Sequence, residues 1–303
     1  MRVAIAGSGD ITRYFTDEFT KKGHEVVILC RSLKPQFNNR PGVSQIVIDF
    51  SSVESIRQAI DESDALVCTI LDYTTVFTDI HLSLIEACRQ STRCKRFIPS
   101  EYRGNLETHP EEPGFYFRTR EPVRKVLREQ NELEWTLVSV GWLVDHVLPS
   151  KNRYLKEIGP AFPVDLVGKK VIIPGTGREP VAVVSARDVA KALAVLLDAP
   201  SWEPYTYISA EEVCWQDVAD AVVEKYPGLS VSHIPQAALE GVVKNGDEDE
   251  RIIAEYQLFS VIGAGRFDPV EVQKQRDTYF KGIHFRTIKE LFDAVERDPE
   301  VIA

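Results

Sequence analysis

The first thirty residues constrain the fold more than any other part of the chain. Residues 1–6 form a short, nearly continuous apolar run, which is typical of a strand buried on both faces of a parallel sheet. Residues 11–22 have helical spacing and end with two lysines before Gly23, as helix C-termini do. A second apolar run follows at 24–30. The order strand, glycine turn, helix and strand predicts a βαβ unit.

The same alternation continues to residue 140. It predicts strands at 44–49, 65–71, 96–99 and 135–140, and helices at 53–60, 77–89 and about 122–130. Strands that alternate with helices indicate an α/β fold with a doubly wound parallel sheet, a Rossmann sheet. Ligands bind such sheets at the carboxyl ends of the strands. We therefore expect function in the loops that follow the strands, including the loop at Leu71.

A glycine turn separates the first strand from the first helix, where backbone N–H groups and the helix dipole can meet a pyrophosphate. Thr12 replaces the third glycine of the G-x-G-x-x-G pattern. Helix and strand must then stand slightly further apart, or the hydroxyl must face the phosphate. An ordinary glycine turn is the alternative interpretation. The residues predicted to bind a dinucleotide here are Gly7, Ser8, Gly9, Asp10, Ile11 and Thr12.

The end of the second strand indicates which dinucleotide binds. NAD sites place an Asp or Glu there to accept from the ribose 2′-OH. This chain instead has Arg31, Ser32 and Lys34, with no acid nearby. Two cations and a hydroxyl suit a 2′-phosphate, so NADPH/NADP+ is the predicted cofactor. The alternative is that Arg31 and Lys34 merely cover a surface loop.

The second half of the chain is less regular. Ser185 and Asp188 match a capping box ahead of an apolar helix at 189–197, and 205–209 resembles a strand that returns to the sheet. We predict an NADP-binding Rossmann domain at 1–150. A smaller, mostly helical substrate-binding lobe is expected at 151–303, with segments at about 181–215 returning to the Rossmann sheet.

Composition excludes several classes of protein. With 36 Lys and Arg against 46 Asp and Glu, the net charge of −10 argues against nucleic-acid binding. No window is apolar for long enough to span a membrane, and no secretory leader is recognised. Five scattered cysteines without metal spacing suit a reducing, cytoplasmic compartment and predict no metal site. The partner is therefore expected to be a small molecule, and the chain a monomer or homodimer.

Four segments resemble the NmrA-like and isoflavone-reductase-like family of atypical short-chain dehydrogenases. They are residues 3–13, 27–32, 95–105 and 123–145. The third is similar to the family signature K-R-F-(I/L)-P-S-E-(F/Y)-G, which in the family lies beside the nicotinamide. The resemblance implies that Ser100 contacts the cofactor and that Glu101 and Tyr102 line the substrate pocket. It mostly lapses beyond residue 233, so it does not transfer a substrate.

Arg120 stands where reductases of this family carry a catalytic lysine. Arginine cannot release a proton at physiological pH, so we expect it to hold the cofactor ribose or to polarise a substrate oxygen. Tyr116 precedes it by one helical turn, and the pair resembles the Y-x-x-x-K of the wider superfamily. There the tyrosine transfers the proton and the cation lowers its pKa. The alternative is that Tyr116 packs with Phe115 and Phe117 in a loop.

Residues 141–146 are similar to a glycine-aromatic stretch that flanks the family's substrate pocket. Gly141 would let the backbone approach the nicotinamide, Trp142 would form a pocket floor, and His146 would line the pocket. Asp145 and His146 could form a proton relay. Adjacent residues seldom face one another, however, so a simple loop pair is favoured.

The leading functional hypothesis is an NADPH-dependent reductase of a small, aromatic or polyketide-like metabolite at a C=C or C=O bond. Tyr116 would donate the proton and Arg120 would give electrostatic support. One alternative is a non-catalytic NADP(H)-binding redox sensor, which would show an apolar exposed patch rather than a closed pocket at Trp142. The other is a non-redox isomerase, cyclase or lyase on the same fold.

Overall fold

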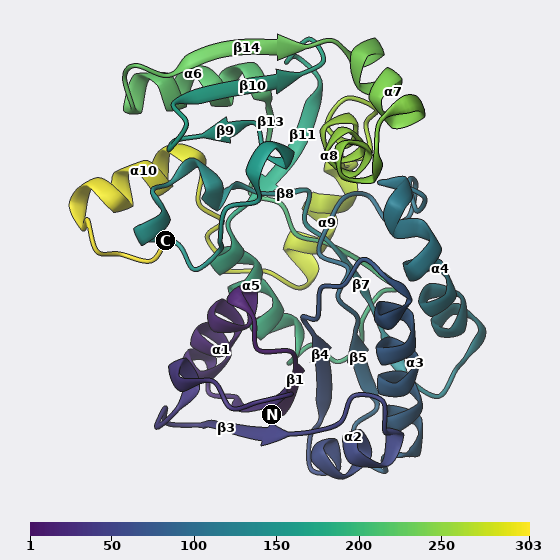
Figure 1. The fold of residues 1–303 in the computed structure, drawn as a ribbon. Helices are drawn as coiled ribbons and strands as arrows, with labels where there is room; N and C mark the ends of the chain where they lie inside the picture. The colour runs from purple at the N-terminus through teal and green to yellow at the C-terminus, as the bar shows by residue number, and fades with distance from the viewer.

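A six-stranded parallel sheet carries the N-terminal half of the chain (Figure 1). The computed structural model describes all 303 residues, and the strands of this sheet follow the order β3-β2-β1-β4-β5-β6. β1 lies between β2 and β4, with Ala4 opposite both Val27 and Leu66. The predicted doubly wound sheet is therefore confirmed. The strands are β1 (Arg2–Ala6), β2 (Glu25–Cys30), β3 (Val43–Val47), β4 (Ala65–Cys68), β5 (Arg96–Ile98) and β6 (Glu134–Trp135).

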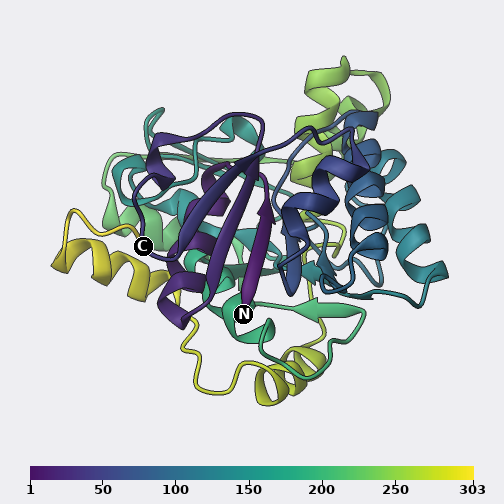
Figure 2. The same cartoon turned by 90° about the horizontal axis from the view of Figure 1, so that it is seen from below.

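Helices cover both faces of this sheet, as the view from below also shows (Figure 2). Side chains alternate along a strand, so Val3 and Ile5 face one apolar core and Ala4 and Ala6 face the other. One layer contains α1 (Asp10–Lys22) and α5 (Ala186–Leu196). The other contains α2 (Val53–Ile60), α3 (Thr75–Gln90) and α4 (Gly114–Glu129).

Helix α4 begins at Gly114, well before the predicted start at Pro122. The N-cap position is Pro113, which offers no side-chain acceptor. The backbone N–H of Phe115 instead donates to Glu255 Oε2 over 2.6 Å. Glu255 lies on α8 (Glu248–Phe259), 140 residues away. This first turn is thus stabilised by a tertiary contact that local sequence does not reveal.

The far edge of the sheet receives a strand from the second half of the chain. β7 (Leu137–Ser139) continues β6 after Thr136, and it pairs in parallel with β12 (Tyr205–Tyr207). The hydroxyls of Thr136 and Thr206 are 2.7 Å apart and fully buried. The predicted strand at 205–209 therefore corresponds to β12, which pairs with the segment that continues β6.

The second lobe contains more strands than expected, since the sequence predicts a mostly helical lobe. The apolar runs at 171–173 and 181–184 predict two of these strands, whereas two-residue strands such as 142–143 and 164–165 leave no periodic pattern. One sheet combines β9 (Val164–Asp165), β10 (Lys170–Pro174) and β14 (Ser230–Ile234), and another β8 (Trp142–Leu143), β11 (Pro180–Val184) and β13 (Glu211–Cys214). The remaining helices are α6 (Trp215–Lys225), α7 (Gln236–Asn245), α9 (Pro269–Thr278) and α10 (Ile288–Arg297).

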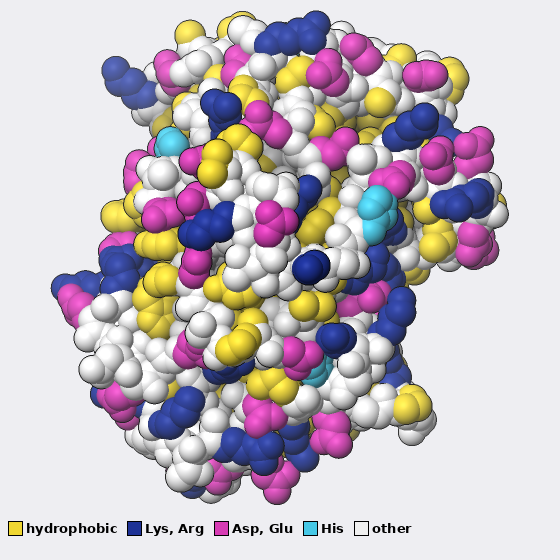
Figure 3. All heavy atoms as spheres, turned by 180° about the vertical axis from the view of Figure 1, so that it is seen from behind, with side chains coloured by type: hydrophobic (Ala, Val, Ile, Leu, Met, Phe, Trp, Pro, Cys, Tyr) yellow, Lys and Arg dark blue, Asp and Glu magenta, His cyan; other side chains and the backbone are white.

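The surface mixes both signs of charge. On the face drawn in Figure 3, acidic and basic side chains are interspersed, so the net charge of −10 is not gathered there. None of the helices combines the length and apolar content needed to cross a membrane.

Asp188 links the start of α5 to the segment that precedes α10. As predicted for a cap, the Asp188 N–H donates to Ser185 Oγ at the start of α5. The Asp188 carboxylate does not complete the capping box, because it accepts from the Arg286 backbone N–H and guanidinium and from Lys191 Nζ. Burial alone would raise the pKa of Asp188, but Arg286 and then Lys191 outweigh it, so the net shift is downward.

We expect Asp188→Asn to destabilise the protein by about 3 kcal/mol, because it leaves the Arg286 guanidinium beside a neutral group. A carboxyl whose pKa is lowered on folding stabilises above its unfolded pKa of about 3.9 and loses that effect as pH falls further. Urea unfolding should therefore show a gap between wild type and variant at pH 7 that shrinks below about pH 4. Asp198→Asn, which removes an exposed carboxylate 3.9 Å from Lys22, should cost under about 0.5 kcal/mol. Equal costs for the two variants would contradict this role.

Candidate functional site

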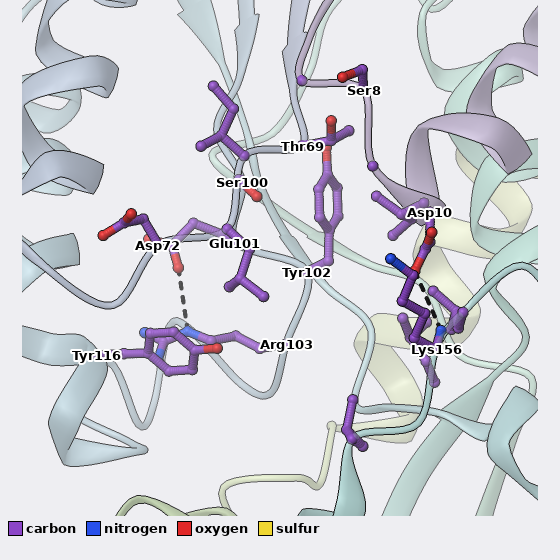
Figure 4. Close-up of a pocket in the computed structure, with 18 of the residues that line it drawn as sticks. Ser8, Asp10, Thr69, Asp72, Ser100, Glu101, Tyr102, Arg103, Tyr116 and Lys156 are labelled. Atoms are coloured by element: carbon purple, nitrogen blue, oxygen red, sulfur yellow. Dashed lines mark hydrogen bonds and ion pairs between the residues drawn. The ribbon is translucent and has the colours of Figure 1, made fainter. Parts of the chain in front are cut away.

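A cavity of about 760 Å³ lies at the carboxyl ends of β1, β2, β4 and β5. It extends from the glycine turn after β1 to the start of α4 (Figure 4). Nearly all of the predicted site residues line it. They are Gly7, Ser8, Gly9, Asp10, Ile11, Arg31, Lys34, Leu71, Ser100, Glu101, Tyr102, Tyr116, Arg120, Gly141, Trp142 and His146.

The glycine turn is shaped to admit a ligand. Gly7 has φ of +117°, and a Cβ there would lie 2.5 Å from Thr69 Oγ1, so only glycine fits. A Cβ on Gly9 would meet no atom within 4 Å, so this residue borders open space. Helix α1 starts at Asp10 with no side-chain cap. Its first N–H groups are therefore available to a phosphate, which fits the predicted dinucleotide.

Thr12 does not line the cavity, contrary to its predicted cofactor contact. It is fully buried, and its hydroxyl lies 3.3 Å from the Gly7 carbonyl oxygen and 2.9 Å from Thr69 Oγ1. The Thr69 hydroxyl donates in turn to the Ala6 carbonyl oxygen. In place of the third glycine, Thr12 thus connects α1 to the glycine turn and to the end of β4.

The loop after β2 presents two cations to the cavity. Arg31 is exposed and Lys34 half-buried, and both line the cavity, whereas the exposed Ser32 does not. Gln45 on β3 holds this loop, because its amide accepts from the Lys34 N–H and donates to the Lys34 carbonyl oxygen. Neither cation makes an ion pair, so both are free to meet an anionic group. The predicted contact of Ser32 gains no support from this geometry.

The family-signature segment after β5 is anchored by buried contacts. Both oxygens of Glu101 accept from the Arg124 guanidinium, at 2.6 and 3.0 Å, and both side chains are 1% exposed. The Tyr102 hydroxyl donates to the Cys68 carbonyl oxygen. Glu101 and Tyr102 therefore line the cavity, but their polar side-chain atoms are already hydrogen-bonded within the protein.

Ser100 is positioned through its backbone. Its N–H donates to His81 Nε2, and His81 Nδ1 lies 2.8 Å from the Phe77 carbonyl oxygen. Burial lowers the pKa of His81 to about 4, so the ring is neutral at physiological pH and can accept at Nε2. This leaves the Ser100 hydroxyl free to face the cavity.

Tyr116 and Arg120 lie on successive turns of α4, so the predicted shared helical face is confirmed and a loop is excluded. The Arg120 guanidinium carbon is 4.2 Å from the Tyr116 ring centre and 3.6 Å from the Phe77 ring centre. The cation thus lies over both rings, and its one hydrogen bond goes to Thr119 Oγ1 and not to the tyrosine hydroxyl. Burial raises the pKa of Tyr116 and outweighs the lowering effect of Arg120. The lowered tyrosine pKa that the resemblance implied is not found.

Tyr256 on α8 completes this group, and sequence reasoning missed it. Its hydroxyl is hydrogen-bonded to that of Tyr116 and lies 3.4 Å from that of Tyr73. Tyr256 also packs edge-on against Phe115. It belongs to the segment where the family resemblance lapses, so no motif pointed to it.

Arg103 was also missed, although it stands at the position of the signature's final glycine. It lines the cavity, its Nε is 3.2 Å from Glu101 Oε2, and its guanidinium lies over the Tyr116 ring. Nη2 makes a long contact of 3.4 Å with the Pro110 carbonyl oxygen. Nε and Nη1 have no hydrogen-bond partner.

The segment after β7 shows a further reason for the glycine at position 141, which was expected only to admit the cofactor. Gly141 has φ of +65°, and a Cβ there would lie 2.1 Å from the Ala182 carbonyl oxygen. Glycine is therefore required by packing against β11, and not only by access to a cofactor. Trp142 is buried at the cavity wall, and its Nε1 donates to Ser260 Oγ.

Asp145 and His146 contact different partners, as expected for two neighbouring loop residues rather than for a proton relay. Asp145 Oδ2 accepts from the Ala186 N–H, while His146 packs near Phe162. Burial raises the pKa of Asp145 to about 6 and lowers that of His146 to about 3, with Arg153 adding to the second shift. His146 is thus a neutral member of the cavity wall.

Comparison with known proteins agrees with this geometry. Residues 6–200 match the model of a family described as NAD(P)H-binding. The chain is 46% identical to oxidoreductase swnR of Arthroderma benhamiae over the full length of both chains. It is 27% identical to isoflavone reductase homolog A622 of Nicotiana glauca, covering 78% of this chain and 79% of that one.

Solved structures share the fold. AtPrR2 with NADP+ and (+)pinoresinol superposes with a TM-score of 0.77 at 17% identity, covering 97% of this chain and 98% of that one. Leucoanthocyanidin reductase from Vitis vinifera, in a ternary complex, gives 0.75 at 18% identity, with 97% and 99% covered. The chain belongs to the NAD(P)H-binding family, is an oxidoreductase, and is similar to isoflavone reductase homologs.

Proposed function

We propose that this protein is an NADPH-dependent reductase that acts on a C=C or C=O bond of a small, aromatic or polyketide-like metabolite. The observation that carries the proposal is one continuous cavity. It joins the glycine turn and the cations after β2 to a buried tyrosine and an aromatic wall. Hydride transfer needs a bound nicotinamide, a pocket that excludes water and a proton source, and this cavity offers a place for each.

The cofactor would lie along the sheet edge. Gly7 to Ile11 would hold the pyrophosphate, and Arg31 with Lys34 the 2′-phosphate. Leu71 and Ser100, at the ends of the next strands, would flank the nicotinamide half. When bound, NADPH supplies the hydride.

Tyr116 would supply the proton. Its pKa is raised by burial, so it is protonated at neutral pH, which suits a proton donor and not a base. Arg120 has no proton to give, but its buried positive charge would stabilise negative charge that develops on the substrate. Tyr256 would orient the Tyr116 hydroxyl through their hydrogen bond.

The non-catalytic sensor is the second candidate, and the replacement of the family's lysine by Arg120 favours it. Against it, Trp142 is only 6% exposed and forms an aromatic wall of the cavity with Phe259 and Tyr256. A wall of this kind helps to keep water from the reacting atoms of a reductase.

Replacing Arg31 should reveal the cofactor preference. Arg31→Met removes a charge-assisted contact to a 2′-phosphate, so we expect NADPH to bind about tenfold or more weakly while NADH changes little. Fluorescence titration with both nucleotides measures this. Arg178→Met, at a surface arginine 68% exposed on the second lobe, is the matched control and should change neither. Equal weakening of both nucleotides by Arg31→Met would refute the 2′-phosphate assignment.

Replacing Tyr116 should separate binding from turnover. Tyr116→Phe keeps the ring that stacks on Arg120 but removes the hydroxyl, so NADPH should bind as before and turnover should fall about 100-fold or more. Consumption of NADPH with a panel of aromatic enones and ketones provides the assay. Tyr226→Phe, at a second-lobe hydroxyl without a partner, should leave turnover unchanged. If Tyr116→Phe turns over like wild type, Tyr116 is not the proton donor.

A further inference from the structure

A segment from the second half of the chain borders the cofactor end of the cavity. Its residues 155–158 line the same cavity as the glycine turn. The Lys156 N–H donates to Asp10 Oδ2 over 3.3 Å, across a sequence separation of 146 residues. Figure 4 shows Lys156 beside Asp10, on the same side of the cavity as Ser8. The backbone at Lys156 is thus placed directly at the first turn of α1.

One face of α1 holds this segment in place. Four of its residues are spaced three or four apart and therefore share one side of the helix, namely Asp10, Arg13, Tyr14 and Asp17. The Tyr154 N–H donates to the Tyr14 hydroxyl oxygen at 2.7 Å, and the Tyr154 hydroxyl donates to Asp17 Oδ2 at 3.1 Å. The Arg13 guanidinium carbon lies 3.6 Å from the Tyr154 ring centre. Contacts with successive turns of the helix therefore fix the segment next to the glycine turn.

Lys156 is the unpaired cation of this segment. Arg153 forms an ion pair with Glu157, whereas the Lys156 amine has no ion-pair partner within 4 Å. Lys156 is exposed and lines the cavity. Arg13, the other cation near the glycine turn, stacks on Tyr154 and does not line the cavity. An anion at the glycine turn would therefore meet Lys156 and not Arg13.

The glycine turn itself carries a negative charge where a pyrophosphate would lie. Asp10 is the first residue of α1, and its carboxylate competes with a phosphate for the helix N-terminus. Arg31 and Lys34 follow β2 and are assigned to the 2′-phosphate, and the other arginines of the cavity lie beside Tyr116. Lys156 is thus the cation that remains to offset Asp10.

We propose that Lys156 binds the pyrophosphate of NADP(H), and that residues 153–158 cover this part of the cofactor from the second half of the chain. A lysine amine is a compact charge that suits a phosphate oxygen. The pyrophosphate is common to NADPH and NADH, so Lys156 contributes to the affinity for both and not to the choice between them. This rests on the proposed placement of the cofactor and not on the proposed reaction.

Three nucleotides separate the pyrophosphate from the 2′-phosphate. NADPH carries both groups, NADH carries only the pyrophosphate, and adenosine 2′-monophosphate carries only the 2′-phosphate. Fluorescence titration measures the Kd of the two reduced nucleotides, and competition against NADPH measures that of adenosine 2′-monophosphate. Lys156→Met should weaken NADPH and NADH by a similar factor, about fivefold or more, and leave adenosine 2′-monophosphate unchanged. Arg31→Met should instead weaken NADPH and adenosine 2′-monophosphate and spare NADH.

Two further variants serve as controls. Lys156→Arg keeps the charge and should retain most of the affinity for both reduced nucleotides. Lys151→Met removes an exposed lysine that pairs with Glu300 and does not line the cavity, so it should change none of the three affinities. Thermal melts establish that each variant is folded.

Hydrogen exchange tests the same contact in the wild-type protein, without any substitution. Backbone amides that a ligand covers or holds exchange more slowly, because local opening becomes rarer. Saturation with NADP+ should slow exchange in peptides that span residues 153–158. Adenosine 2′-monophosphate, which has no pyrophosphate, should leave those peptides unchanged.

Three results overturn the proposal. They are unchanged affinities for NADPH and NADH in Lys156→Met, a loss of adenosine 2′-monophosphate binding as large as the loss of NADH binding, and exchange at residues 153–158 that NADP+ does not slow. Failure of the proposed cofactor placement would look different, since wild type would bind neither reduced nucleotide or Arg31→Met would not distinguish them. A protein that binds NADPH but reduces no substrate would leave all of these binding measurements valid.

Discussion

The buried ion pair of Glu101 and Arg124 determines where the rest of the site lies. Glu101 follows β5 at the sheet edge, whereas Arg124 lies two turns along α4 from Tyr116. Their bidentate contact therefore joins the sheet edge to the helix that carries Tyr116 and Arg120. Because both side chains are excluded from water, removing one partner would leave an uncompensated charge. Arg103 lies beside the same carboxylate, with its Nε 3.2 Å from Glu101 Oε2.

The site also depends on contacts between the two halves of the chain. Glu255 accepts from the first turn of α4, and its neighbour Tyr256 is hydrogen-bonded to Tyr116. Trp142 is held by Ser260, at the end of the same segment. Residues before 150 form most of the cofactor end, although Lys156 also borders it and donates its backbone N–H to Asp10 Oδ2, whereas the substrate end requires both halves. Such a division lets substrate preference vary while the nucleotide cradle is retained.

The sequence allowed the cofactor end to be predicted more fully than the substrate end, for physical reasons. Strands buried on both faces and the glycine turn leave local patterns, so the parallel sheet and the residues from Gly7 to Ile11 could be recognised. Thr12 was predicted to contact the cofactor, but its hydroxyl is hydrogen-bonded within the fold, to Gly7 and Thr69. Thr69 is distant in the sequence, so no local pattern indicated this contact. Tyr256 reaches the cavity only through long-range packing, and no local pattern reports such a contact.

Arginine at position 120 changes what helix α4 can contribute. The guanidinium is stacked between Phe77 and Tyr116, an arrangement that suits its planar, weakly hydrated cation better than a compact ammonium. Because this cation does not titrate at physiological pH, it acts as a fixed charge and cannot shuttle a proton. In the proposed reductase the proton would come from Tyr116, whose hydroxyl is hydrogen-bonded to that of Tyr256 on the second lobe. The replacement of lysine would then leave Arg120 with an electrostatic role and no part in proton transfer.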